Sequence, residues 1–150
     1  MALRVWLPLN GNLNNYGLDN ITIDGTASFV ESNMGKGQDL LKQLTFTVPS
    51  LVDKKVFSVA WWFKIKSNTS RTGDWMDHIC FSLVNSEGAT NSHRCECCYT
   101  TANVVANWYG GLAAWGSSGA QKDKWYHMTY TCDGTTAKSY LNGVCYQTAA

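Results

Sequence analysis

The stretch VFSVAWWFKIK, residues 56–66, constrains the fold more than any other part of the chain. Large apolar residues occupy every second position, and the positions between them hold small, polar or charged residues, apart from Trp62 and the leading Val56. Successive side chains of a β-strand point to opposite faces, so this pattern predicts a strand with one buried and one exposed face. The expected buried residues are Phe57, Val59, Trp61, Phe63 and Ile65.

The same alternation recurs in ALRVWLPL (2–9), LTFTV (44–48) and WYHMTYTC (125–132), and no window sustains a helical period beyond about two turns. Short segments that favour positive φ separate the runs, as tight hairpins require. These turns are Asn10-Gly11, Asp24-Gly25, Gly35-Lys36-Gly37, Asp133-Gly134 and Asn142-Gly143. We therefore predict an all-β fold of two packed antiparallel sheets, formed by residues 1–150 as a single domain.

Composition narrows the classes of function. Twelve basic and eleven acidic residues nearly balance, so the overall charge gives no reason to expect nucleic-acid binding. The N-terminal segment lacks the apolar core of a signal peptide, and no stretch is long enough to cross a membrane. We expect neither secretion nor membrane insertion, so free thiols are favoured for the six cysteines, and a Cys132–Cys145 disulfide is left open.

The C-terminal segment WYHMTYTCDGTTAKSYLNGVCYQT resembles the strand–turn–strand signature of laminin-G-like, concanavalin-A-like jelly rolls. There, a Trp-x-His-apolar strand leads through Asp-Gly to an aromatic-apolar-Asn-Gly turn. FSVAWWFKIKS resembles the central strand of the family, and ICFSLVNSEG resembles the strand that follows it. The opening LPLNGNLNNYGLDNITIDG resembles the first strand and loop of such domains, particularly in phage virion proteins. The resemblance implies a concanavalin-A-like jelly-roll sandwich over most of the chain.

The resemblance also implies a few dozen further residues after the Asn-Gly turn, which supply the last strands and close the sheet beside the first strand. This chain stops at VCYQTAA. Either residues 1–150 are the N-terminal part of a longer protein or another molecule supplies the closing strand. We expect a chain held in an assembly, since an unpaired sheet edge invites aggregation.

Catalysis is not expected. Glycoside hydrolysis by such folds needs two carboxyl groups flanking a cleft, and the three glutamates do not share a strand face. Asp74 and Asp77 lie in an expected loop. No histidine lies in a nucleophile motif, and His127 is assigned a structural hydrogen-bonding role on its strand.

Cofactors are not expected either. HRCECC places His93, Cys95 and Cys97 in a row on a strand, which differs from the C-x₂₋₄-C spacing of structural zinc sites and favours free thiols. Some laminin-G-like domains hold calcium at the sandwich rim, and the resemblance makes Asp77 or Asp133 the candidate ligands. The chain has no dense run of oxygen ligands, and Asp133 fits a hairpin turn better.

Exposed aromatic residues remain as binding candidates, because sugars stack their C–H faces on flat rings. Trp62 is the first candidate, for contact with a ligand or with another chain, and the glycine-rich segment NVVANWYGGLAAWGSSG adds others. For Trp108 and Trp115 packing in the core is the favoured interpretation, and Trp61 and Trp125 are expected to be core or sheet-packing residues. The candidate ligand-binding residues are Trp62, Trp108, Tyr109 and Trp115.

Two functions follow from these observations. The first is a non-catalytic virion structural module, a phage decoration, fibre or spike component that packs against copies of itself or other virion proteins and is made in the host cytoplasm. The second is a carbohydrate-binding, lectin-like module that attaches to a cell-surface glycan. The phage-like opening, the lack of an export signal and the lack of a carboxylate pair favour the first.

Overall fold

The computed structural model describes residues 3–32, 35–38, 45–49, 56–64, 78–83, 95–99, 105–109, 112–114 and 120–149. In the segments 78–83, 95–99, 105–109 and 112–114, it describes the course of the backbone. The chain forms two compact units, residues 1–52 and 53–150. The described residues form antiparallel strands and connecting loops, and none lies in a helix long and apolar enough to span a membrane.

The N-terminal unit contains two small antiparallel sheets. Strand β1 (Thr22–Asp24) pairs with β4 (Thr45–Thr47), and β2 (Phe29–Ser32) forms a hairpin with β3 (Gly35–Gln38). Phe46 and Val48 are half-buried between exposed neighbours, as the alternation in LTFTV predicts. These strands have three or four residues each, and loops make up much of the described part of this unit.

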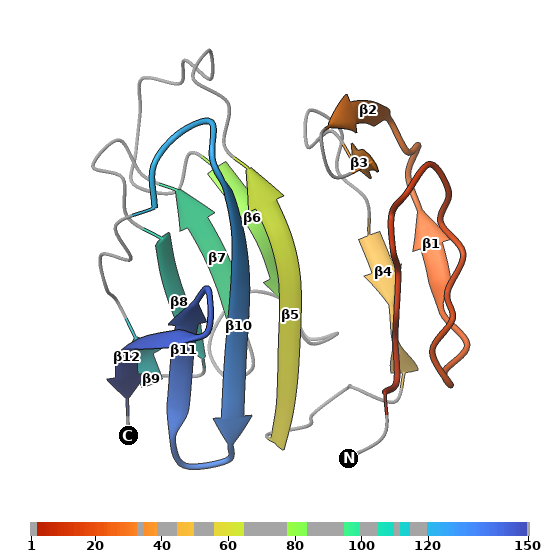
Figure 1. Ribbon diagram of the computed structural model, residues 1–150. Coiled ribbons are helices and arrows are strands. Elements are labelled where there is room, and N and C mark those ends of the chain that lie inside the picture. Colours follow the sequence, from red (N-terminus) through yellow and green to blue (C-terminus); the bar gives the residue numbers. More distant parts are fainter. Residues whose placement is uncertain are drawn as a thin grey trace. The chain divides into compact units, whose positions relative to one another are not determined.

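The C-terminal unit contains two four-stranded antiparallel sheets (Figure 1). The first has the order β12-β11-β10-β5, and the second has the order β6-β7-β8-β9. The sheets approach each other where β8 and β9 pass β11 and β12. This arrangement confirms the predicted all-β, concanavalin-A-like sandwich. The strands are β5 (Val56–Lys64), β6 (His78–Leu83), β7 (Cys95–Tyr99), β8 (Val105–Tyr109), β9 (Leu112–Ala114), β10 (Trp125–Asp133), β11 (Ala137–Leu141) and β12 (Val144–Ala149).

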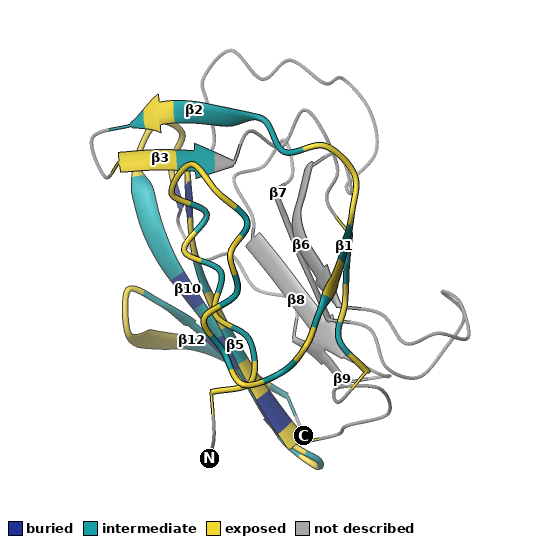
Figure 2. Ribbon diagram, turned by 90° about the vertical axis from the view of Figure 1, so that its right-hand side faces the viewer, coloured by how far each residue is buried: buried dark blue, intermediate teal, exposed yellow. Residues whose placement is uncertain are grey.

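The first of these sheets has one buried face and one outer face, and Figure 2 shows buried positions along β5 and β10. Met128 and Tyr130 of β10 are fully buried, and Phe57 and Phe63 of β5 are nearly so. Strand β10 pairs along its whole length with β5, so both alternating patterns bury the same face. Trp61, Tyr126, Leu141 and Tyr146 pack around Phe63 and Met128.

Turn chemistry fixes the ends of these strands. Asn142 and Gly143 have φ values of 50° and 82°, the left-handed pair that a two-residue β-hairpin requires between β11 and β12. At the other end of β10, the Asp133 carboxylate accepts hydrogen bonds from the backbone N–H groups of Thr135 and Thr136. These bonds hold the pKa of Asp133 below its ordinary value, because they stabilise the charged form. Both turns were predicted from the sequence.

Two predicted elements differ in the structure. Residues 3–9 form no strand; they hydrogen-bond to the loop at 16–19, through Leu18 N–H to Leu3 O and Tyr16 N–H to Trp6 O. The alternation of this segment is kept at Val5, Leu7 and Leu9, which are half-buried between exposed neighbours, whereas Leu3 is 60% exposed. Residues 35–37 lie in β3 rather than in a turn, because their backbone pairs with β2.

Candidate functional site

A shallow hollow of about 530 Å3 lies on the outer face of the β12-β11-β10-β5 sheet. Trp62, Trp125, His127 and Asn142 line it, and we call it the outer-face hollow. The register of β5 against β10 builds it: Trp62 lies opposite His127, and Lys64 lies opposite Trp125. These residues alternate with the buried positions on both strands, so the same pleat that fills the core directs them outward.

Two tryptophan rings give the outer-face hollow its apolar surface. Trp62 is 54% exposed, and its ring centroid lies 5.1 Å from that of His127, with the ring planes tilted by 53°. Trp125 is half-buried, and the Lys64 ammonium lies 5.7 Å from its ring centroid. Exposed aromatic rings beside a hollow are typical of surfaces that contact ligands or partners, so this face is the candidate site.

Asn142 supplies the polar edge of the hollow and is held in place by two hydrogen bonds. Its Oδ1 accepts from the His127 backbone N–H at 2.9 Å, and its own backbone N–H donates to the His127 carbonyl oxygen at 2.8 Å. Because Oδ1 is engaged, the side-chain orientation is fixed and the NH2 group remains as a donor beside the hollow. The His127 backbone makes both of these bonds and its imidazole lines the hollow, so a structural hydrogen-bonding role of the side chain stays a prediction.

Three of the four predicted binding residues lie in described strands, and these three belong to two different sheets. Trp62 lies in the outer-face hollow. Trp108 and Tyr109 lie in β8 of the other sheet, where their backbones pair with Ala113 and Leu112. Trp115 lies outside the described residues. The structure therefore places only Trp62 at a described hollow, and a binding role for all four stays a prediction.

The sequence analysis missed Trp125, His127 and Asn142 as site residues. Trp125 was expected to be a core or sheet-packing residue; it is half-buried and lines the outer-face hollow, whereas Trp61 packs against the core. The period-two pattern of β10 already set Trp125 and His127 apart from the buried Met128. The missing information was that β10 lies beside β5 in a register that brings them to Trp62.

The disulfide that was left open between Cys132 and Cys145 does not form. Cys132 is buried on β10, Cys145 is exposed on β12, and β11 lies between the two strands. Both are free thiols.

The metal hypotheses concern residues that the structure describes only in part. Cys95 and Cys97 lie in β7, as the extended pattern predicted, while His93 and Asp77 fall outside the described residues. Within the described part of the chain, no group of three or more His, Cys, Asp or Glu side chains is placed to hold a metal ion. The Oδ1 atom of Asp133 accepts three hydrogen bonds within its own turn, one of them from the Thr135 hydroxyl.

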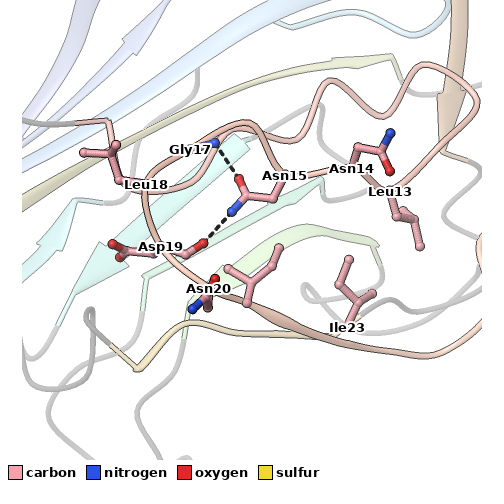
Figure 3. Close-up of a pocket in the computed structure, with 9 residues that line it drawn as sticks. Leu13, Asn14, Asn15, Gly17, Leu18, Asp19, Asn20 and Ile23 are labelled. Atoms are coloured by element: carbon pink, nitrogen blue, oxygen red, sulfur yellow. Dashed lines mark hydrogen bonds between the residues drawn. The ribbon is translucent and has the colours of Figure 1, made fainter.

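A second hollow, of about 360 Å3, lies in the N-terminal unit (Figure 3). Its central polar group is already used: Asn15 Oδ1 accepts from the backbone N–H groups of Trp6 and Gly17, and its Nδ2 donates to the Asp19 carbonyl. Gly17 passes so close to Arg4 that a Cβ there would collide with the Arg4 backbone. The Asn15 amide therefore connects the loop segments that form this hollow.

The sandwich and the aromatic outer-face hollow define a concanavalin-A-like, jelly-roll class of domain. A laminin-G family model, described as "Concanavalin A-like lectin/glucanases superfamily", matches residues 41–150, and the chain belongs to this family. Among solved structures, the chain is similar to domain 4 of AbnA, a GH43 extracellular arabinanase from Geobacillus stearothermophilus, in complex with arabinotriose. That match has a TM-score of 0.62 and 18% identity and covers 99% of this chain and 75% of the other, so it shows the fold alone. No curated protein matches.

Proposed function

We propose that this chain is a carbohydrate-binding module that holds a glycan in the outer-face hollow without cleaving it. The observation that carries this proposal is the pairing of an exposed Trp62 ring with Trp125, His127 and Asn142 around one open hollow. Sugar C–H faces stack on such rings, and the Asn142 amide and the His127 imidazole are suited to hydrogen-bond sugar hydroxyls. An open, shallow shape suits one segment of an extended chain.

The chemistry of the lining supports binding rather than hydrolysis. A glycosidase needs two carboxyl groups on either side of the scissile bond. The four described residues that line the outer-face hollow include no carboxylate. The similar arabinanase domain was solved with arabinotriose, which makes arabino-oligosaccharides the first ligands to test.

The test compares Trp62→Ala with Trp6→Ala in titrations against a panel of soluble oligosaccharides. Trp6 is the matched control, because it is also a tryptophan, is 53% exposed and belongs to the N-terminal unit. We expect Trp62→Ala to weaken binding by about tenfold or more, since a central aromatic contact is worth about 1.5 to 2 kcal/mol or more. Trp6→Ala should bind as the wild type does. Equal affinity of wild type and Trp62→Ala would overturn the proposal.

One observation supports a second candidate function, packing against other protein chains. Leu3, Trp6, Tyr16 and Leu18 of the N-terminal unit are all more than half exposed, and the Trp6 and Tyr16 rings lie 5.6 Å apart. Exposed apolar and aromatic residues of this kind are typical of surfaces that pack against other protein chains. If the protein acts by packing, Trp6→Ala should lower its oligomeric state in analytical ultracentrifugation while Trp62→Ala leaves it unchanged.

The outer-face hollow thus favours the function that the sequence analysis ranked second. A role in a phage virion, a location there and virion partners stay predictions from the sequence resemblance. Calcium at Asp77 or Asp133 stays an open alternative, and a calorimetric titration of metal-free protein with calcium tests it.

A further inference from the structure

Among the described residues, a lysine is the charged side chain that lies against a ring of the outer-face hollow. Lys64 lies at its edge, next to Trp125, and no acidic residue is among the four that line it. Lys122 and Lys124 precede Trp125 in the segment QKDKW, with Asp123 between them. The whole chain carries a formal net charge of only +1, so this excess of lysine is local.

Lys64 differs from the paired charges of the N-terminal unit. There, Arg4 pairs with Asp19 at 3.2 Å and Lys36 pairs with Glu31 at 3.5 Å. Within the described part of the chain, the Lys64 ammonium instead lies against the Trp125 ring, and no carboxylate pairs with it. A cation over a tryptophan face keeps its hydrogen-bonding capacity, since the ring attracts the charge without accepting its protons as a carboxylate does.

We propose that the outer-face hollow selects a glycan unit that carries a negative charge, a uronic acid carboxylate or a sulfate ester. The sugar ring stacks on the exposed Trp62, and its anionic group pairs with the Lys64 ammonium, which lies over the Trp125 ring. The inference rests on the proposed carbohydrate binding and adds the class of sugar. Since Lys64 is exposed, its ion pair with the ligand is modest in strength and weakens with salt.

The experiment uses an oligouronate and the same oligosaccharide with its carboxyl groups reduced to alcohols, so that the two ligands differ in charge but not in the sugar skeleton. A sulfated form of the reduced oligosaccharide is the third ligand and distinguishes the two sources of negative charge. The variants are Lys64→Gln and, as the matched control, Lys138→Gln. Lys138 lies opposite Thr131, near the other end of the same sheet, and carries the same charge.

We expect the wild type to bind one of the anionic ligands about fivefold more tightly than the reduced one, a ratio that falls at high salt. Lys64→Gln should bring the ratio close to one, and Lys138→Gln should leave it unchanged. Equal binding of anionic and reduced ligands by the wild type, with Trp62 still required, overturns this inference and leaves the proposed function standing. If the wild type binds neither these three ligands nor any oligosaccharide of the panel, this inference and the proposed function are both overturned.

Discussion

Asn142 connects the stability of the sheet to the outer-face hollow, and its substitutions separate the two contributions. Its φ of 50° lies in the left-handed region, which costs most residues about 1 kcal/mol and costs glycine nothing. Its side chain accepts the 2.9 Å hydrogen bond from the His127 backbone N–H, which is worth about 1 kcal/mol. Each substitution removes a different part of this sum.

Asn142→Ala loses both contributions and should lower the free energy of unfolding by about 2 kcal/mol. Asn142→Gly loses only the hydrogen bond and should cost about 1 kcal/mol. Asn142→Asp keeps an acceptor oxygen and the tolerance for positive φ, so it should stay within about 0.5 kcal/mol of the wild type. The expected order of stability is therefore Asn142→Asp, then Asn142→Gly, then Asn142→Ala, the least stable.

Equilibrium urea unfolding, followed by tryptophan fluorescence, measures the three differences. The same samples are titrated with the best oligosaccharide of the panel, and Asn142→Gly should bind about fivefold more weakly, because it lacks the amide donor. If Asn142→Ala is no less stable than Asn142→Gly, the strain argument for this turn is wrong. If Asn142→Gly binds as tightly as the wild type, Asn142 does not belong to the site.

Two further predictions concern the core and the Asp133 turn. Met128→Ala should destabilise the protein by about 3 kcal/mol in urea unfolding, since Met128 is fully buried, whereas Met128→Leu should cost less than about 1.5 kcal/mol; equal costs would contradict tight packing there. The lowered pKa of Asp133 means that its charge stabilises the fold above the unfolded value near 3.8, and that this contribution is lost as the pH falls through the folded pKa. The stability difference between wild type and Asp133→Asn should therefore shrink from pH 7 to about pH 3, and a difference independent of pH would refute this.

Part of the candidate site could be predicted from local sequence, and part could not. The alternation around Trp62 set it on an outer face, and the structure confirms that position. Trp125 was not recognised as a site residue, because a tryptophan in a sandwich most often packs in the core or against the sheet, and its own segment does not reveal which strand lies beside it. The predicted strand at 2–9 failed for a related reason: residues 16–19 supply its hydrogen-bond partners, and they form a loop rather than a ladder.

By itself, the sequence determined which side chains of β5 and β10 point the same way and that the chain turns at Asp133-Gly134 and at Asn142-Gly143. The period of two and the φ preferences of Asn-Gly and Asp-Gly are local properties of the backbone, so they need no knowledge of neighbouring strands. Only the tertiary structure decided that β5 lies beside β10, in the register that places Trp62 opposite His127. The two strands are some sixty residues apart in the sequence, and they pair because together they bury their apolar faces in one core. The outer-face hollow exists only because of this pairing.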